Sequence, residues 1–223
     1  MDDLQKESLK NLSELKLQAV FVNDNANHDF EIISSEEELK NAVHKVIEEH
    51  NIDIVIMGTK GASNAIENFM GSNTVHVLKK IKDCPVLVIP EELEFVIPKQ
   101  IAFPTDYNRF YEKSVLESIS AIANLFDSMI KVLHISTEKK LSITQEFNKK
   151  ILADYLENKR HSFHWKSDCT DKSTTITTFI DENKIELLAM VNYKHSLLET
   201  ILNEPVIKKL AFNPTVPLLI IPE

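Results

Sequence analysis

The sequence predicts an α/β fold made of two doubly wound, parallel-sheet domains in tandem, the first lacking its opening β-α-β unit. A succession of helix, apolar strand, loop, helix and apolar strand occurs twice along the 223 residues. Met57 and Pro85 of the first copy recur as Met190 and Pro217 of the second, at nearly the same separation along the chain. This repeat and the alternation of strand with helix are the observations behind the prediction.

A charged, proline-ended stretch over 91–98 separates the two copies. Domain boundaries commonly fall in such polar linkers. We therefore expect an incomplete domain over 1–92 and a complete-length domain over 98–223.

The elements of the first copy follow from local patterns. Ser35 and Glu38 have the spacing of a capping box, and an apolar stripe at helical spacing follows them. The run 52–57 is apolar and rich in β-branched residues, as in a parallel strand covered on both faces. A helix that starts near Asn73 and a strand over 85–90, with proline at each end, complete the copy.

The second copy is longer than the first. The same criteria predict strands over 101–103, 130–135, 162–165, 185–190 and 216–222, and helices over 112–126, 142–157 and 174–183. It therefore has a strand, a helix and a strand before its long helix.

The first copy, by contrast, begins directly in the counterpart of that long helix. The predicted buried stripe of this helix is Leu4, Leu9, Leu12 and Leu15, and a strand is expected over 30–33. A sheet without its opening strands has an open edge, which is a liability unless a neighbour, a dimer mate or the second domain covers it.

Composition narrows the classes of function. A net charge of -9 and a pI near 5.4 argue against a nucleic-acid partner. No apolar run approaches the roughly 20 residues that cross a bilayer, and the acidic, polar start is unlike a signal peptide. We expect a cytoplasmic protein with no membrane partner.

Neither cysteines nor histidines indicate a metal site. Cys84 and Cys169 lie far apart, so we predict two reduced thiols, with Cys84 a small packing residue. His161 and His164 are three apart, which on a strand directs them to opposite faces. His76 and His134 are single histidines in apolar stretches, and each is predicted to be a packed or a surface residue rather than a metal ligand.

The best candidate for chemistry is a glycine pattern at the end of strand 52–57. Gly58 and Gly61 are followed after nine residues by Gly71, which opens a helix. Ligands of open α/β sheets bind at the carboxyl ends of strands, and helix N-termini favour anions. The alternative is structural: a tight turn at the first two glycines and close packing at Gly71.

This spacing resembles the ATP-binding signature of the universal stress protein family. The segments 52–61, 71–74 and 84–90 match that family, and 103–106 and 132–134 resemble its first two strands. The resemblance covers nearly the whole chain and implies adenine nucleotide alpha hydrolase-like, Rossmann-like domains. It also implies a pocket for ATP or AMP, with Mg as a further cofactor.

The resemblance assigns roles to particular residues. Those implied to bind nucleotide in the first domain are Met57, Gly58, Thr59, Gly61, Gly71, Ser72, Asn73 and Thr74. Those implied to form the adenosine end of a second-domain pocket are Pro104, Thr105, Asp106 and Val132.

Departures from the family pattern leave half a pocket in each domain. The first has the loop but lacks the strand that would supply the aspartate. In the second, Val191 and Lys194 replace the first two glycines, and 203–205 replaces the third glycine and its serine. A β-branched side chain and a carboxylate would crowd and repel phosphate, so we expect no triphosphate there.

The resulting hypothesis is a stress-response regulatory module that binds ATP or AMP through the first-domain loop. The alternatives are a nucleotide-free interaction or dimerisation scaffold and a weak ATPase, although no motif supplies a catalytic residue. Val86–Ile89 and Leu218–Ile221 are the expected pairing edges, either in a homodimer or within one chain as a pseudo-dimer.

Overall fold

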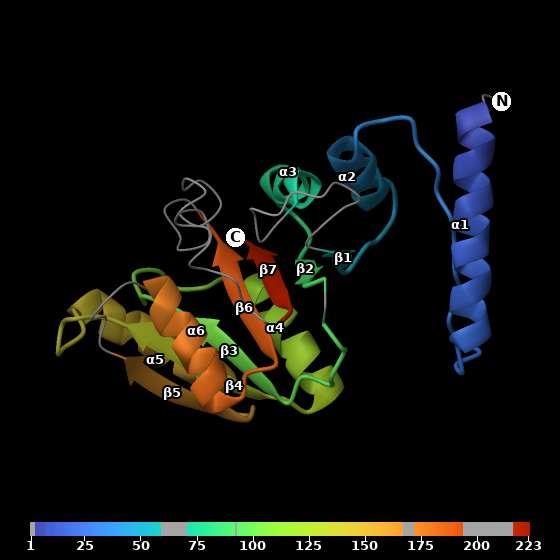
Figure 1. The fold of residues 1–223 in the computed structure, drawn as a ribbon. Coiled ribbons are helices and arrows are strands. Elements are labelled where there is room, and N and C mark those ends of the chain that lie inside the picture. The colour runs from blue at the N-terminus through green and yellow to red at the C-terminus, as the bar shows by residue number, and fades with distance from the viewer. Residues whose placement is uncertain (1–2, 59–70, 92, 167–171, 194–215) are drawn as a thin grey trace.

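The computed structural model describes residues 3–58, 71–91, 93–166, 172–193 and 216–223, and its described strands form one seven-stranded sheet in the order β1-β2-β7-β6-β3-β4-β5 (Figure 1). The strands are β1 (Val55–Gly58), β2 (Val86–Ile89), β3 (Gln100–Pro104), β4 (Met129–Ile135), β5 (His161–Lys166), β6 (Leu187–Asn192) and β7 (Leu218–Pro222). The helices are α1 (Asp3–Val22), α2 (Leu39–Glu49), α3 (Ser72–Lys80), α4 (Lys113–Phe126), α5 (Ile143–Leu156) and α6 (Lys172–Asn183). The α/β fold class is confirmed.

The two halves join through their last strands. The adjacent strands β7, β6, β3, β4 and β5 are all parallel, and so are β1 and β2. Strands β2 and β7 pair antiparallel, with Leu87 opposite Leu219. The expected intrachain pairing is therefore confirmed, and it turns two predicted sheets into one. Because each of these strands has a second neighbour in the same sheet, neither offers a free edge to a homodimer. The division at 92–98 into two domains stays a prediction.

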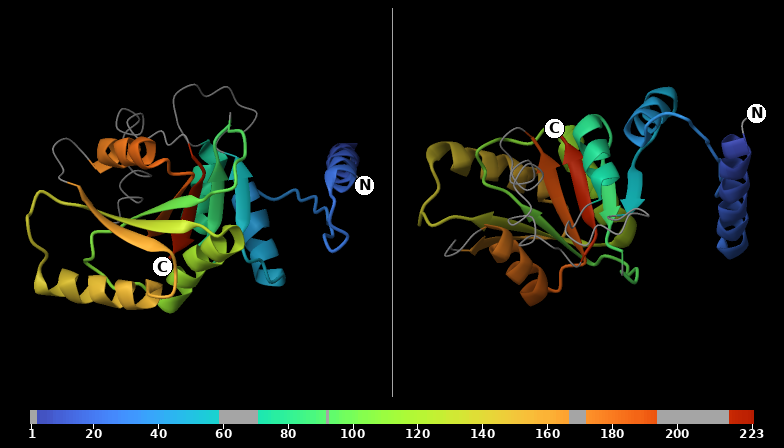
Figure 2. Two further views of the ribbon diagram at one scale, coloured as in Figure 1. Left: turned by 90° about the horizontal axis from the view of Figure 1, so that it is seen from below. Right: turned by 45° about the horizontal axis from the view of Figure 1, so that its top comes forward.

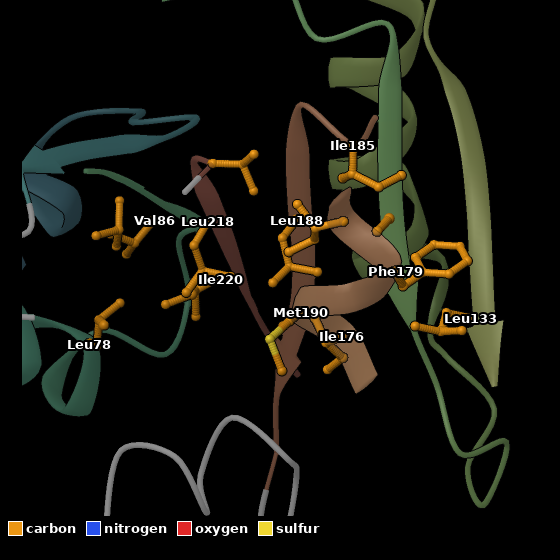
Figure 3. Close-up of a cluster of buried hydrophobic side chains, with 14 of the residues drawn as sticks. Leu78, Val86, Leu133, Ile176, Phe179, Ile185, Leu188, Met190, Leu218 and Ile220 are labelled. Atoms are coloured by element: carbon orange, nitrogen blue, oxygen red, sulfur yellow. The ribbon is translucent and has the colours of Figure 1, made fainter. Parts of the chain in front are cut away.

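Side chains of a strand point alternately to the two faces of its sheet. At β7 helices pack against both of these faces. On β7, Leu218 and Ile220 enter a first core cluster with residues of α3 and α6 (Figure 3). Leu219 and Ile221 enter a second cluster with residues of α4 and α5. The second half is thus doubly wound, as predicted.

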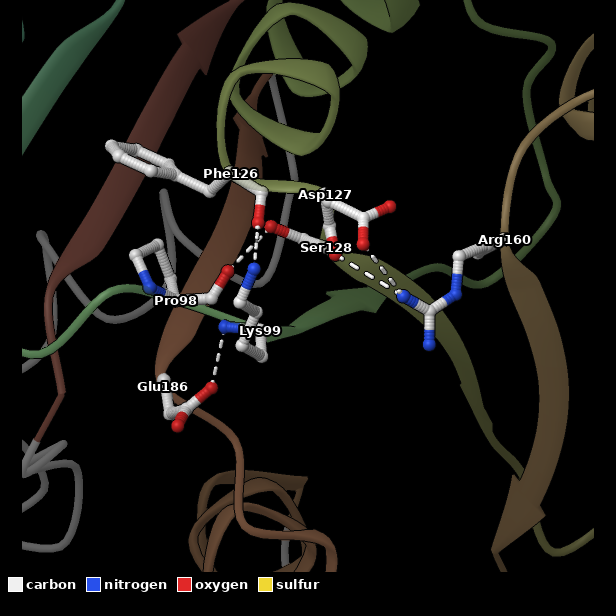
Figure 4. Close-up of polar contacts among 7 residues, drawn as sticks. All are labelled: Pro98, Lys99, Phe126, Asp127, Ser128, Arg160 and Glu186. Atoms are coloured by element: carbon white, nitrogen blue, oxygen red, sulfur yellow. Dashed lines mark hydrogen bonds and ion pairs between the residues drawn. The ribbon is translucent and has the colours of Figure 1, made fainter.

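The linker ends at a set of polar contacts where β3 begins (Figure 4). The Glu186 carboxylate accepts hydrogen bonds from the backbone N–H groups of Lys99 and Gln100, at 2.6 and 3.0 Å. The Ser128 hydroxyl donates to the Pro98 carbonyl, and Lys99 Nζ donates to the Phe126 carbonyl at 2.6 Å. These bonds fix the start of β3 beside β4 and β6.

Two predictions at the N-terminus are wrong. Helix α1 forms, but none of its residues is buried, with Leu4 and Leu15 73% and 61% exposed. Residues 30–33 form no strand. In the second half the corresponding β5 pairs with β4, and α5 shares a cluster with α4. The described residues of the first half contain no counterpart of β4 or α4, so α1 and 30–33 have nothing to pack against.

Two smaller predictions have different outcomes. The capping box at Ser35 does not form: α2 begins at Leu39 with Glu38 as its N-cap, and the Ser35 hydroxyl accepts from the Glu37 N–H at 3.1 Å. The open edge of the first half is confirmed, since β1 is the last strand of the described sheet on that side.

Candidate functional site

Both ends of the glycine pattern meet at the carboxyl end of β1. Gly58 is the last residue of that strand, and Gly71 is the N-cap of α3. The Thr74 hydroxyl donates a 2.8 Å hydrogen bond to the Gly58 carbonyl, and Thr74 is buried. This bond joins the strand end to the first turn of the helix. Thr59 and Gly61, also predicted to bind nucleotide, lie outside the described residues.

The N-terminus of α3 has the features that favour an anion. Among the described residues no side chain caps this helix, and Ser72 and Asn73 are exposed. Within that part of the chain its first N–H groups therefore have no intrahelical or side-chain cap acceptor. Gly71 has φ -59° and ψ 153°, which other residues adopt as readily. A glycine here is not required by the backbone, so the use of Gly71 must lie in the absence of a side chain.

Around Met57 the site is open. Met57 is partly buried and packs against the first core cluster. On the other side of β1 the described residues supply no strand, and hence no counterpart of Asp106. Within the described structure this half brings together the two ends of the glycine pattern but no counterpart of Asp106.

Of the second-half residues, Pro104, Thr105 and Asp106 lie at the carboxyl end of β3, and Val132 lies in the middle of β4. Thr105 is buried, and its hydroxyl accepts from the Tyr107 N–H at 3.1 Å and from the Tyr111 hydroxyl at 2.8 Å. The Asp106 carboxylate accepts from the backbone N–H and the side-chain amide of Asn108, both at 2.9 Å. Pro104 ends β3 and is partly buried, whereas Val132 is fully buried in the second cluster.

His134 is buried, so of the two expected alternatives the packed one holds. Its Nδ1 lies 2.9 Å from the Thr105 carbonyl oxygen, which can only accept, so Nδ1 donates to it. Within the described residues Nε2 has no hydrogen-bond partner. The ring stacks on Tyr107 and meets Trp165 edge-on, both with 4.8 Å between centroids. This histidine holds the end of β3 to β4.

Sequence reasoning missed three residues that contact one another near Asp106. Arg109 forms an ion pair with Glu223 at 2.8 Å, and its guanidinium lies 4.7 Å from the centroid of the Tyr193 ring. Burial, followed by the charge of Asp106, raises the pKa of Tyr193 to about 12. We call Arg109, Tyr193 and Glu223 the clasp. Its members are far apart in sequence, so no spacing could have indicated it.

The remaining predictions concern cysteine, histidine and the degenerate loop. Cys84 is a free, buried thiol whose pKa is raised by burial, which confirms its packing role. Among the described residues no group of His, Cys, Asp and Glu could hold a metal ion. No described helix is long and apolar enough to cross a membrane. Val191 is buried in the second cluster, whereas Cys169, Lys194 and 203–205 lie outside the described residues.

Comparison with known proteins adds the decisive observation. Residues 1–90, which contain the glycine pattern, match the model of the universal stress protein family. The resemblance to that family is therefore confirmed for these residues. No curated protein sequence matches the chain.

Solved structures extend the likeness from these 90 residues to the whole fold. A universal stress protein from Archaeoglobus fulgidus shares the fold with a TM-score of 0.68 at 15% identity, covering 100% of this chain and 78% of its own. A Pseudomonas aeruginosa protein assigned to the same family gives 0.64 at 11% identity, covering 96% and 77%. A functionally unknown Pseudomonas aeruginosa protein gives 0.58 at 11%, covering 98% and 78%. At these identities the likeness is one of fold.

Proposed function

We propose that this chain is a regulatory module of the stress response that binds an adenine nucleotide, ATP or AMP, through the glycine loop of its first half. The observation that carries the proposal is the 2.8 Å bond between Thr74 and Gly58, which brings both ends of the glycine pattern together. The family match of residues 1–90 supports an adenine nucleotide as the ligand.

The phosphates lie at the N-terminus of α3 in this proposal. The uncapped N–H groups of its first turn and the positive end of its dipole attract a phosphate. Gly71 lets the phosphate approach the backbone closely, and Ser72 and Asn73 are exposed beside it. Mg²⁺ bound with ATP takes its ligands from phosphate oxygens and water, and needs few from the protein.

The adenosine end is held less firmly. Met57 offers an apolar contact beside the loop, but no described residue of this half occupies the place that Asp106 has in the second half. We therefore expect weaker binding than a complete pocket would give, with the phosphates supplying most of the contacts.

The second half binds no triphosphate in this proposal. Its aspartate accepts two hydrogen bonds from Asn108, and the clasp residues Tyr193 and Arg109 lie near it. The Arg109–Glu223 ion pair connects Arg109 to the residue that follows β7. A nucleotide here would have to displace these contacts.

Gly71→Ala tests the site most sharply. Alanine adopts φ -59° and ψ 153° without strain, so the variant should keep its stability or gain about 0.4–1 kcal/mol. Its methyl group would nevertheless crowd a phosphate on α3. We expect the ATP and AMP affinity measured by calorimetric titration to fall about tenfold, which corresponds to about 1.4 kcal/mol.

Two further variants serve as controls. Gly71→Glu adds a negative charge at the proposed phosphate site and should abolish binding. Ser114→Glu adds the same charge to the first turn of α4, at an exposed position in the other half, and should leave binding unchanged. If Gly71 serves only close packing, Gly71→Ala lowers the stability instead. A folded wild type that binds no nucleotide at millimolar concentration would leave the nucleotide-free scaffold as the function.

A further inference from the structure

Strand β1 has the side chains of a central strand but lies at an edge. Its counterpart β6 lies between β7 and β3, with every residue from Leu187 to Val191 buried. In β1, by contrast, Ile56 is 63% exposed. An exposed, apolar edge strand is a template for pairing with another chain.

The backbone of β1 is also free on its outer side. The Val55 N–H donates to the Pro85 carbonyl at 2.9 Å, so this residue faces β2. Because peptide groups alternate in direction along a strand, the N–H and carbonyl of Ile56 point to the open side. No described strand pairs with them.

Among the described residues no helix covers the face that carries Ile56, which is 63% exposed. In the second half α4 and α5 cover the corresponding face with residues of the second cluster. Helix α1 occupies the place of α5 in the order of elements, yet it stands away from the sheet (Figures 1 and 2). Large apolar side chains are exposed along its last turns: Leu15, Leu17, Val20, Phe21 and Val22. Within its described residues one chain thus has both an exposed sheet face at β1 and a helix, α1, that packs on no sheet.

We propose that two copies of this chain associate through these surfaces, with the β1 edges paired antiparallel about a twofold axis and α1 of each copy covering Ile56 of the other. Each copy supplies the helix and the strand that the other lacks, and a twofold interface is self-complementary in this way. The antiparallel pairing continues the sheet as β2 and β7 already do inside the chain.

Charge and size favour a second copy as the occupant. The chain carries a net charge of -9, which opposes the close approach of two copies. Helix α1 carries no net charge and so adds nothing to this repulsion, because Asp3, Glu7 and Glu14 are balanced by Lys6, Lys10 and Lys16. A stable interface buries about 800 Å² per partner. The four-residue edge cannot supply that alone, and the exposed apolar end of α1 supplies the missing area.

This proposal is independent of nucleotide binding, and sedimentation velocity of the full chain tests it. We expect a dimer whose fraction falls on dilution. Ile56→Lys should shift the dissociation constant at least tenfold towards monomer, because it places a charge on the shared face. Ile143→Lys is the matched control, since Ile143 is 88% exposed on α5 in the other half and should leave the dimer unchanged.

Two more variants separate the roles of edge and helix. Ile56→Pro removes an N–H that faces away from β2, so it should weaken the dimer without breaking the β1–β2 ladder. Phe21→Lys should weaken it through α1. A monomeric wild type at the highest concentrations, or a dimer that none of these variants weakens, would overturn the proposal, as would a monomer that pairs only with a different protein.

Discussion

The two halves of the molecule use the same succession of elements and end in different states. In the second half β6 is enclosed by β3 and β7, and α5 buries Leu152 and Leu156 in a core cluster. In the first half β1 is an edge strand, and α1 buries none of its residues. The difference shows that a helix such as α1 can form from its local pattern alone, whereas its neighbours determine whether it is buried.

The halves differ in the same complementary way at their carboxyl ends. The first brings Gly58 to the N-terminus of α3, where no described side chain caps the helix. The second has Asp106, with Tyr193 and Arg109 near it. Neither half combines the open glycine end with the aspartate among the described residues. A ligand that needs both is expected to bind the first half weakly.

The largest effect should come from a core leucine of the enclosed half. Leu152 of α5 is 2% exposed, so Leu152→Ala removes buried methyl groups and leaves a cavity. We expect a loss of about 2–5 kcal/mol in the free energy of unfolding. Urea unfolding followed by circular dichroism measures it. A loss below about 1 kcal/mol would show that the packing of α5 contributes little to the free energy of unfolding. The contrast with the exposed α1 would then be wrong.

A second effect concerns alkaline pH and again belongs to the second half. Burial raises the pKa of Tyr193 to about 12, and it raises the pKa of Tyr107 and Tyr111 well above the usual value of a tyrosine. Because the folded state favours the neutral phenol, this stabilisation is complete below about pH 10 and is lost as the pH rises through 12. Stability should therefore fall over that range.

Tyr193→Phe isolates the contribution of the clasp to this pH dependence. Phenylalanine keeps the ring beneath Arg109 but has no proton to lose. The variant should lose less stability between pH 10 and 12 than the wild type does, in unfolding experiments at a series of pH values. An identical decline in both proteins would mean that Tyr193 is not shielded beside Asp106.

Most element positions could be predicted from the sequence, because strands such as 85–90 and helices such as 112–126 carry strong local patterns. The pairing of Leu87 with Leu219 was also within reach, since both strands end a copy of the repeat. The exposure of α1 could not be predicted from its apolar residues, because such residues are buried only where a partner surface exists. The clasp could not be predicted for a related reason: Arg109 and Glu223 are far apart in the sequence, and only the folded chain brings them into contact.

The smallest expected effect is in α1 and sharpens the comparison most. Leu15 is 61% exposed, so Leu15→Ala in dilute, monomeric protein should change the free energy of unfolding by no more than about 0.5 kcal/mol. The same variant should become destabilising as protein concentration rises, because association with a second copy would bury α1 and stabilise the folded state. Thermal unfolding of both proteins over a range of concentrations measures the difference. If the effect is small at every concentration, α1 is exposed in the associated state as well; if it is large even in dilute protein, α1 packs within its own chain and the two halves are more alike than their burial indicates.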